Sequence, residues 1–211
     1  MNLFWIVRIV SLLIGYGFGC ILTAEWIAKR WTGHGAGELG DTGNPGMANI
    51  MASLGFVPGI LTLAGDLGKC ILAAVLTSVL FHGSGRILIL YAGLGCTLGH
   101  DFPVWRRFRG GKGVATTSMA VVLYAFFPGL AANIAGMLTV FVSKYLCIGG
   151  PVIPAVFLVL MAVKGDAEAA YLAGVLTLLA VRAHWSSICG IPAGQTKKTD
   201  VPAANRKKLR K

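Results

Sequence analysis

The chain has 211 residues, of which 55% are hydrophobic and only 13% are charged, and its mean hydropathy is +0.72. A soluble domain of this length does not need so much apolar surface, so the composition excludes an ordinary globular protein and predicts an integral membrane protein. The net charge of +11 would suggest a nucleic-acid partner in a soluble protein. Here the basic residues lie between and after apolar segments, which is typical of membrane anchoring, so we expect no nucleic acid.

The first apolar segment, residues 4–28, is predicted to be a retained membrane helix rather than a cleaved signal peptide. It begins without a basic cluster and precedes several more apolar segments of membrane length. Further spans are expected at about 55–81, 86–100, 114–127, 129–146, 151–164 and 167–185. Several are shorter than the roughly 20 residues of a full crossing, and Phe127-Pro128-Gly129 is the weakest divider, since proline can kink a membrane helix without ending it.

The expected fold is therefore an all-α integral membrane protein with about seven transmembrane helices and short cytoplasmic loops that carry the polar motifs. With the amino terminus outside, most of the 19 lysines and arginines fall on the inner side, while Arg8, Arg86 and Lys164 stay outside. Three polar, glycine-rich segments, 29–54, 100–113 and 184–198, then face the cytoplasm. We expect one membrane domain over 1–195 and a basic cytoplasmic tail over 196–211.

Several residues inside the apolar segments favour structural roles. Asp66 and Lys69 lie three residues apart on one helix face at membrane depth, where an internal ion pair is favoured over direct catalysis. Glycines spaced four apart allow helices to approach closely; the pairs are Gly15 and Gly19, Gly55 and Gly59, and Gly95 and Gly99. The five cysteines stand singly and show no metal-ligand spacing, so we expect neither disulfides nor a metal.

The segment around Gly110-Gly111-Lys112-Gly113 has the chemistry of an anion site. Backbone donors freed by the glycines, a helix amino terminus and a point charge can act together on a phosphate. It is not a Walker A loop, because Gly113 rather than serine or threonine follows the lysine. The alternative is a basic inner loop that only fixes topology, and Arg106 and Arg107 suit that role or contact with lipid phosphates.

Other polar residues permit two interpretations each. Thr42, Asn44 and Asn49 can donate to a phosphate or to a developing oxyanion, although the surrounding Gly43-Asn44-Pro45-Gly46 is also an ordinary turn signal. His184 ends the last span, where a neutral imidazole can accept a hydroxyl proton or serve only as a hydrogen-bonded anchor. His100 carries the same ambiguity and could orient its loop rather than react.

Three of these motifs resemble, in order, those of the PlsY-type acyl-phosphate:glycerol-3-phosphate acyltransferases. Residues 40–49 are similar to the first motif, residues 99–117 match the second almost throughout, and residues 184–198 resemble the third more loosely. Asp66 with Lys69, and Lys144 with Tyr145, extend the similarity over most of the chain.

The resemblance implies a multi-pass enzyme of a bacterial-type inner membrane, with its active site facing the cytoplasm. It would transfer a fatty acyl group from acyl phosphate to the sn-1 hydroxyl of glycerol 3-phosphate, giving lysophosphatidic acid and phosphate, without a metal or other cofactor. An activated anhydride needs no covalent nucleophile, so binding and alignment dominate. His184 and Lys112 are the expected catalytic residues. The expected substrate-binding residues are Thr42, Gly43, Asn44, Asn49, His100, Arg109, Gly110, Gly111, Gly113, Ser187 and Lys198.

The sequence also departs from the family pattern. Ala52 stands where the first motif has an arginine, a bidentate phosphate ligand. In the third motif Ser187 replaces an asparagine, Gly190 an arginine and Thr196 a glutamate. Cys147 and Gly150 occupy positions where serines are usual. Three interpretations stay open: an active acyltransferase in which Lys112, Arg109 and Lys198 compensate, a divergent paralogue with another acceptor or no turnover, and a small membrane transporter.

Overall fold

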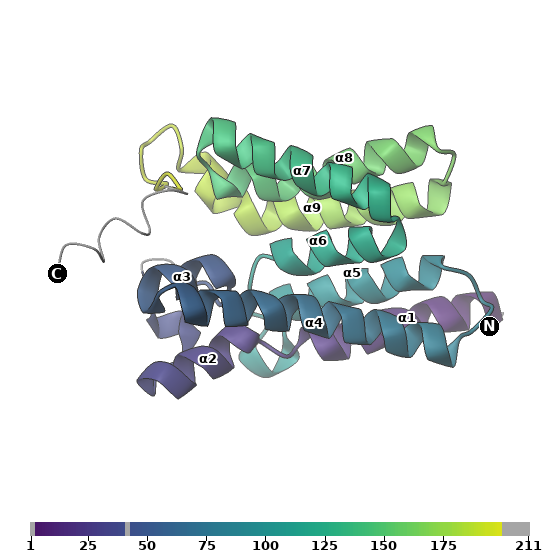
Figure 1. Ribbon diagram of the computed structural model, residues 1–211, viewed down its shortest axis with the longest axis horizontal. Coiled ribbons are helices and arrows are strands. Elements are labelled where there is room, and N and C mark those ends of the chain that lie inside the picture. Colours follow the sequence, from purple (N-terminus) through teal and green to yellow (C-terminus); the bar gives the residue numbers. More distant parts are fainter. Residues whose placement is uncertain (1–2, 41–42, 200–211) are drawn as a thin grey trace.

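The computed structural model of the chain describes residues 3–40 and 43–199, and within them it is an all-helical bundle (Figure 1). The helices, in chain order, are α1 Leu3–Gly19, α2 Thr23–Thr32, the 3-10 helix η1 Ala36–Glu38, α3 Met47–Leu54, α4 Phe56–Leu80, α5 Ile87–Asp101, the 3-10 helix η2 Val104–Arg106, α6 Val114–Tyr124, α7 Phe126–Ser143, α8 Leu146–Val163 and α9 Ala167–Cys189.

Six helical segments in the described part of the chain are long and apolar enough to cross a membrane, which confirms the predicted multi-pass class. The seventh apolar helix, α6, has only 11 residues. It rises about 16 Å, roughly half the hydrocarbon thickness of a bilayer. The expected seven spans are thus six long helical segments and one short helix packed among them.

The prediction of one continuous helix over residues 4–28 is wrong, because the helix breaks between α1 and α2; the segment Leu3–Thr32 is still one of the six candidate spans. Three carbonyls at the break lack helical partners and are satisfied from distant segments. Lys69 Nζ donates to Gly19 O (3.3 Å) and to Ile21 O (2.9 Å), and Trp105 Nε1 donates to Cys20 O (2.7 Å). These donors replace the lost helical hydrogen bonds, which would be costly to leave unmade at this depth.

Three other predicted boundaries also move. α6 and α7, predicted as 114–127 and 129–146, divide at Ala125, so Pro128 lies in the first turn of α7, where its missing N–H is harmless. The next turn falls at Lys144, whose φ is 63°, and α8 therefore begins five residues before Pro151. The eight-residue helix α3 was not expected from the sequence.

The glycine pairs of α1 and α5 bring the two backbones into contact, as predicted. A Cβ atom at Gly15 or Gly19 would overlap the backbone of Ala92 or Cys96, and a Cβ at Gly95 would overlap that of Leu12. Gly59 likewise faces the side chain of Met51 at the α3–α4 corner. Small residues let membrane helices pack by van der Waals contact, which is the main source of helix association in lipid.

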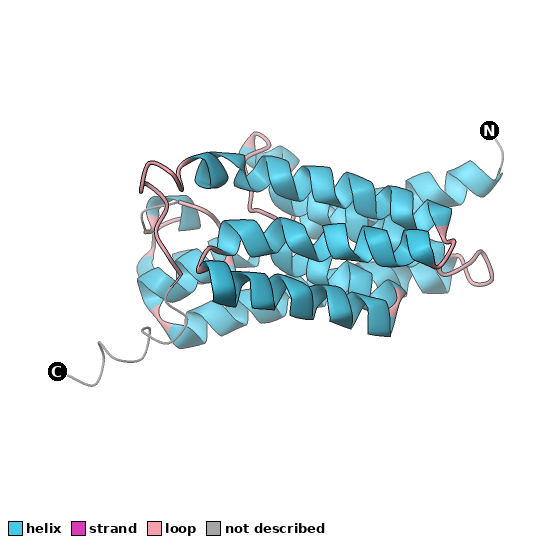
Figure 2. Ribbon diagram, turned by 90° about the horizontal axis from the view of Figure 1, so that it is seen from above, coloured by secondary structure: helices cyan, strands magenta, loops and turns pink. Residues whose placement is uncertain are grey.

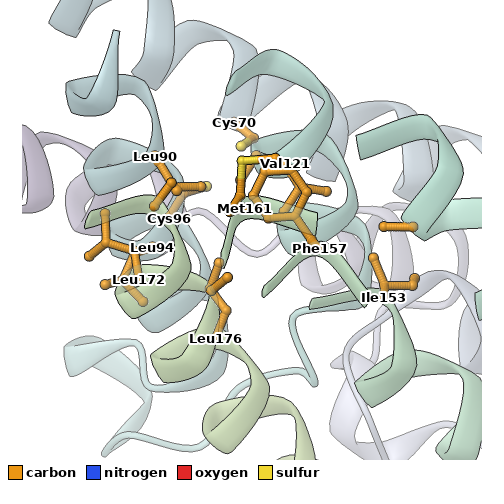
Figure 3. Packing of buried hydrophobic residues seen from close by; sticks show 14 residues of the cluster. Cys70, Leu90, Leu94, Cys96, Val121, Ile153, Phe157, Met161, Leu172 and Leu176 are labelled. Atoms are coloured by element: carbon orange, nitrogen blue, oxygen red, sulfur yellow. The ribbon is translucent and has the colours of Figure 1, made fainter. Parts of the chain in front are cut away.

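A second packing centre joins α5, α6, α8 and α9 around Phe157, whose side chain is fully buried (Figure 3). Leu90, Val121, Met161 and Leu176 belong to the same buried cluster. The cluster includes Leu172, Ala173 and Leu176 of α9, the helix that carries His184 nearer its end.

All the polar motifs lie at one end of the bundle (Figures 1 and 2). α2, α3, the segment after α5, the α7–α8 corner and the segment after α9 meet there, opposite the end where α1 begins. The three basic residues predicted to stay outside, Arg8, Arg86 and Lys164, belong to the other end. The helix topology therefore collects residues distant in sequence into one site.

Candidate functional site

An open cavity of about 720 Å³ lies at the motif-bearing end of the bundle. Its volume falls within the range of small-molecule sites. The described residues that line it come from four segments and include no acidic residue: Gly40, Asn44, Ala48, Asn49, Ala52, Ser53, Lys112, Leu146, Cys147, His184, Ser187, Gln195, Thr196, Lys197 and Thr199. A cavity with cations and amides but no carboxylate suits an anionic ligand.

Lys112 precedes α6 and enters this cavity half-buried. Its Nζ donates to Ser187 Oγ on α9 at 3.2 Å and makes no ion pair with a carboxylate in the described part of the chain. Burial lowers the pKa of the Lys112 amino group below its ordinary value. The side chain thus retains donors that can bind an anion in the cavity.

His184 faces the same cavity from α9, although it is only 2% exposed. Its Nδ1 lies 2.9 Å from Ala180 O. A carbonyl only accepts, so Nδ1 carries the proton and Nε2 of the neutral ring carries the lone pair. Gly150 lies against the ring, because a Cβ there would come within 3.2 Å of Nε2. Nε2 is therefore the nitrogen of His184 that can accept a proton, and the catalytic role of the residue stays a prediction.

The segment after α9 folds back over the cavity, and hydrogen bonds within it and to Ser187 and Lys144 hold it there. Thr196 Oγ1 donates to Ser187 O at 2.5 Å, the Gln195 amide donates to Gly190 O at 3.0 Å, and the Thr199 amide donates to Lys144 O at 2.7 Å. Thr196, Lys197 and Thr199, which fall in the predicted tail 196–211, thus line the cavity; residues 200–211 lie outside the described range.

Lys197 in this segment is the cavity lysine that sequence reasoning missed. Lys198, which was expected to bind substrate, is exposed and does not line the cavity. The resemblance pointed to the second lysine of the pair, whereas the first one lines the cavity; both side chains are exposed.

Residues of the first motif, 40–49, form another part of the cavity wall. Asn44 and Asn49 line the cavity. Asn49 Nδ2 donates to Leu39 O at 2.9 Å, so this residue also fixes the preceding loop. Gly43 lies outside the cavity lining, with a φ of 57°. Thr42 lies outside the described residues.

The structure uses two of the expected glycine amides within the loop itself. The Gly110 amide donates to Asp101 O and the Gly111 amide to His100 O, each at 2.9 Å. Gly113, with a φ of 64°, is the N-cap of α6 and provides no side-chain cap, and the helix amino terminus lies two residues after Lys112. The loop therefore positions the lysine and the helix end, while the amides of Gly110 and Gly111 serve the turn.

Two further expected residues do not line the cavity. His100 is buried with Lys69, whose Nζ lies 2.8 Å from His100 Nδ1 and 2.9 Å from Asp66 Oδ1. The predicted ion pair of Asp66 and Lys69 is present, and through Lys69 this network also supports the break between α1 and α2, which the sequence did not predict. Arg109 is exposed and also lies outside the lining.

Four of the departures from the family pattern lie in the cavity wall: Ala52, Cys147, Ser187 and Thr196. Ala52 leaves space where an arginine was expected, and Cys147 presents a thiol where serine is usual. Within the described residues, no group of three or more metal-ligating side chains is present.

Together the fold and cavity define a multi-pass membrane protein with a cationic ligand site at one end. The family model described as glycerol-3-phosphate acyltransferase matches residues 9–194. Glycerol-3-phosphate acyltransferase 1 of Lactobacillus acidophilus is 38% identical over 96% of this chain and 97% of its own length. The corresponding protein of Lactobacillus johnsonii is 36% identical over 95% and 96%. The chain therefore belongs to the glycerol-3-phosphate acyltransferase family.

A solved relative has the same fold. The crystal structure of PlsY (YgiH), an integral membrane glycerol 3-phosphate acyltransferase, in its glycerol 3-phosphate form is 24% identical, with a TM-score of 0.78 over 93% of this chain and 96% of that chain. The lysophosphatidic acid form of that protein aligns with the same TM-score over 90% and 94%.

Proposed function

We propose that this protein transfers a fatty acyl group from acyl phosphate to the sn-1 hydroxyl of glycerol 3-phosphate, releasing lysophosphatidic acid and phosphate. The observation that carries the proposal is the shared cavity of Lys112 and His184, in a chain that belongs to the glycerol-3-phosphate acyltransferase family. Family membership also supports turnover over the inactive-paralogue and transporter interpretations.

In the proposed reaction the hydroxyl oxygen of glycerol 3-phosphate attacks the acyl carbon, and the bond between that carbon and the phosphate oxygen breaks. His184 Nε2 accepts the hydroxyl proton, because Nδ1 is held by Ala180 O. Lys112 and the amino terminus of α6 bind a substrate phosphate. The proton on His184 then passes to the released phosphate or to water.

Lys197 supplies the second cation that this chemistry requires. Two phosphate-bearing substrates meet in one cavity, and the described lining holds two lysines, Lys112 and Lys197. Asn44, Asn49 and Ser187 add neutral polar groups near the same space, where they can orient the acceptor or stabilise the oxyanion. The basic residues around the cavity favour a cytoplasmic orientation of this end.

The direct test supplies the purified protein, reconstituted in lipid nanodiscs, with palmitoyl phosphate and glycerol 3-phosphate. We expect phosphate release together with lysophosphatidic acid, identified by mass spectrometry. Parallel reactions with glycerol and dihydroxyacetone phosphate test the acceptor. A protein that releases no phosphate with glycerol 3-phosphate contradicts the proposed function, and faster reaction with another acceptor contradicts the substrate assignment.

A further inference from the structure

A second hollow, the tryptophan cleft, lies on the outer side of α2 and shares no lining residue with the cavity of the proposed reaction. Its volume is about 660 Å³. It is lined by residues of α2 and by one residue of η2: Glu25, Trp26, Ile27, Lys29, Arg30, Trp31 and Trp105.

The cleft arises from the two faces of α2. Ala24, Ile27 and Ala28 are buried in a small apolar cluster with Ile50 of α3. The other face leaves Trp26 70% exposed. Trp31 and Trp105 are likewise half-exposed, at 50% and 52%. Because Trp105 Nε1 is bonded to Cys20 O, its ring is fixed at the cleft wall.

The charges of the cleft favour an anion. The buried carboxylate of Glu25 is already engaged: it accepts from the Ala36 amide at 3.0 Å and lies 3.5 Å from Arg106 Nη1 and 3.6 Å from Lys29 Nζ. Arg30 is exposed and makes no ion pair with any described residue. The cleft lining thus holds two cations, Lys29 and Arg30, against the single carboxylate of Glu25, which leaves an excess of positive charge.

We propose that the tryptophan cleft binds the headgroup of an anionic phospholipid. The lipid phosphate would lie at Lys29 and Arg30, and its glycerol backbone would lie against the indole rings. Indoles are favoured at the membrane interface, and basic pockets beside membrane helices bind anionic headgroups. Exposed indoles in this number suit an amphipathic ligand better than a soluble anion. The site is separate from the acyl-transfer reaction and does not depend on it.

Native mass spectrometry of the detergent-solubilised protein tests the site with phosphatidylglycerol and phosphatidylcholine of equal chain length. We expect the wild-type protein to bind phosphatidylglycerol more tightly. Lys29→Gln with Arg30→Gln is expected to weaken that preference about fivefold for each charge removed. The matched control, Arg86→Gln with Lys164→Gln, removes two exposed charges at the opposite end of the bundle and is expected to keep the preference.

Two further arms separate the lipid from other occupants. Trp26→Ala with Trp31→Ala should weaken phosphatidylglycerol binding although both cations remain. Soluble glycerophosphoglycerol should not displace the lipid at equal concentration. Equal lipid preference in the Lys29 and Arg30 variant overturns the proposal. Displacement of the lipid by glycerophosphoglycerol also overturns the proposal, because it would indicate a site for free phosphates. A lipid-free dimer that the Lys29 and Arg30 variant abolishes overturns it as well.

Discussion

Lys69 and Lys112 mark two regions of this bundle that use the same side chain for opposite purposes. Lys69, 4% exposed, lies among Asp66, His100 and two backbone carbonyls, so its donors are consumed by the protein. Lys112 is half-buried, donates to Ser187 and faces an open cavity without acidic residues among its described lining. A lysine whose donors are saturated by the fold is structural, whereas one with donors directed at a cavity is available to a ligand.

The largest expected effect comes from Lys69→Ala. The change leaves the buried Asp66 carboxylate without its cation and two carbonyls at the α1–α2 break without a donor. Breaking a buried pair on one side costs about 3–5 kcal/mol of unfolding free energy. Denaturation by sodium dodecyl sulfate in mixed micelles measures the loss. The double variant Lys69→Met with Asp66→Leu should lose less, and a single variant as stable as wild type contradicts the structural role.

Lys112→Ala should behave in the opposite way, with activity lost and folding retained. Removing one donor of this kind lowers kcat about 10²- to 10³-fold. The phosphate-release assay measures the rate, and the same denaturation measurement serves as the control for folding. Ser187→Ala, which removes only the protein partner of Lys112, should cost far less. If Lys112→Ala unfolds the protein as severely as Lys69→Ala, the distinction between the two lysines fails.

A smaller effect is expected from Lys197→Gln, which tests the second cation. Losing one charge-assisted contact to phosphate costs about 1.5–3 kcal/mol, or roughly 10- to 150-fold in binding of the affected substrate. Lys198→Gln is the matched control, since it removes the same charge from the neighbouring residue outside the cavity lining. Titrations of each substrate should show a larger rise in KM for Lys197→Gln. Equal rises would mean that only the net charge of the segment matters.

The sequence could predict an integral membrane protein with its three motifs at one end of the bundle. The length of the apolar segments follows from the thickness of the bilayer, and the basic residues between them indicate which loops lie on the same side. It could not predict the α1–α2 break, whose donors Lys69 and Trp105 lie 48 and 85 residues beyond their acceptors. Nor could it choose between Lys197 and Lys198, since adjacent polar residues after a helix carry no periodicity. The backbone amides of the glycine loop were predicted to bind a phosphate. Instead, the amides of Gly110 and Gly111 donate to carbonyls at the end of α5.

The smallest expected effect is a shift in pH dependence, and it follows from the environment of Lys112. Burial lowers the pKa of this amino group, so the cation is lost at a lower pH than for a lysine in water. Glycerol 3-phosphate binding should therefore weaken as the pH rises through that lowered pKa, and be constant below it until the phosphate itself is protonated. Isothermal titration at successive pH values measures the midpoint.

Lys112→Arg provides the control for this titration, because a guanidinium stays protonated throughout the accessible range. The variant should keep its affinity, whatever its starting value, at alkaline pH where the wild type loses it. Lys197→Gln should bind more weakly but keep the wild-type midpoint, since Lys112 remains. If wild type and Lys112→Arg weaken in parallel, the titrating group lies elsewhere, and Lys112 is not the cation that holds the phosphate.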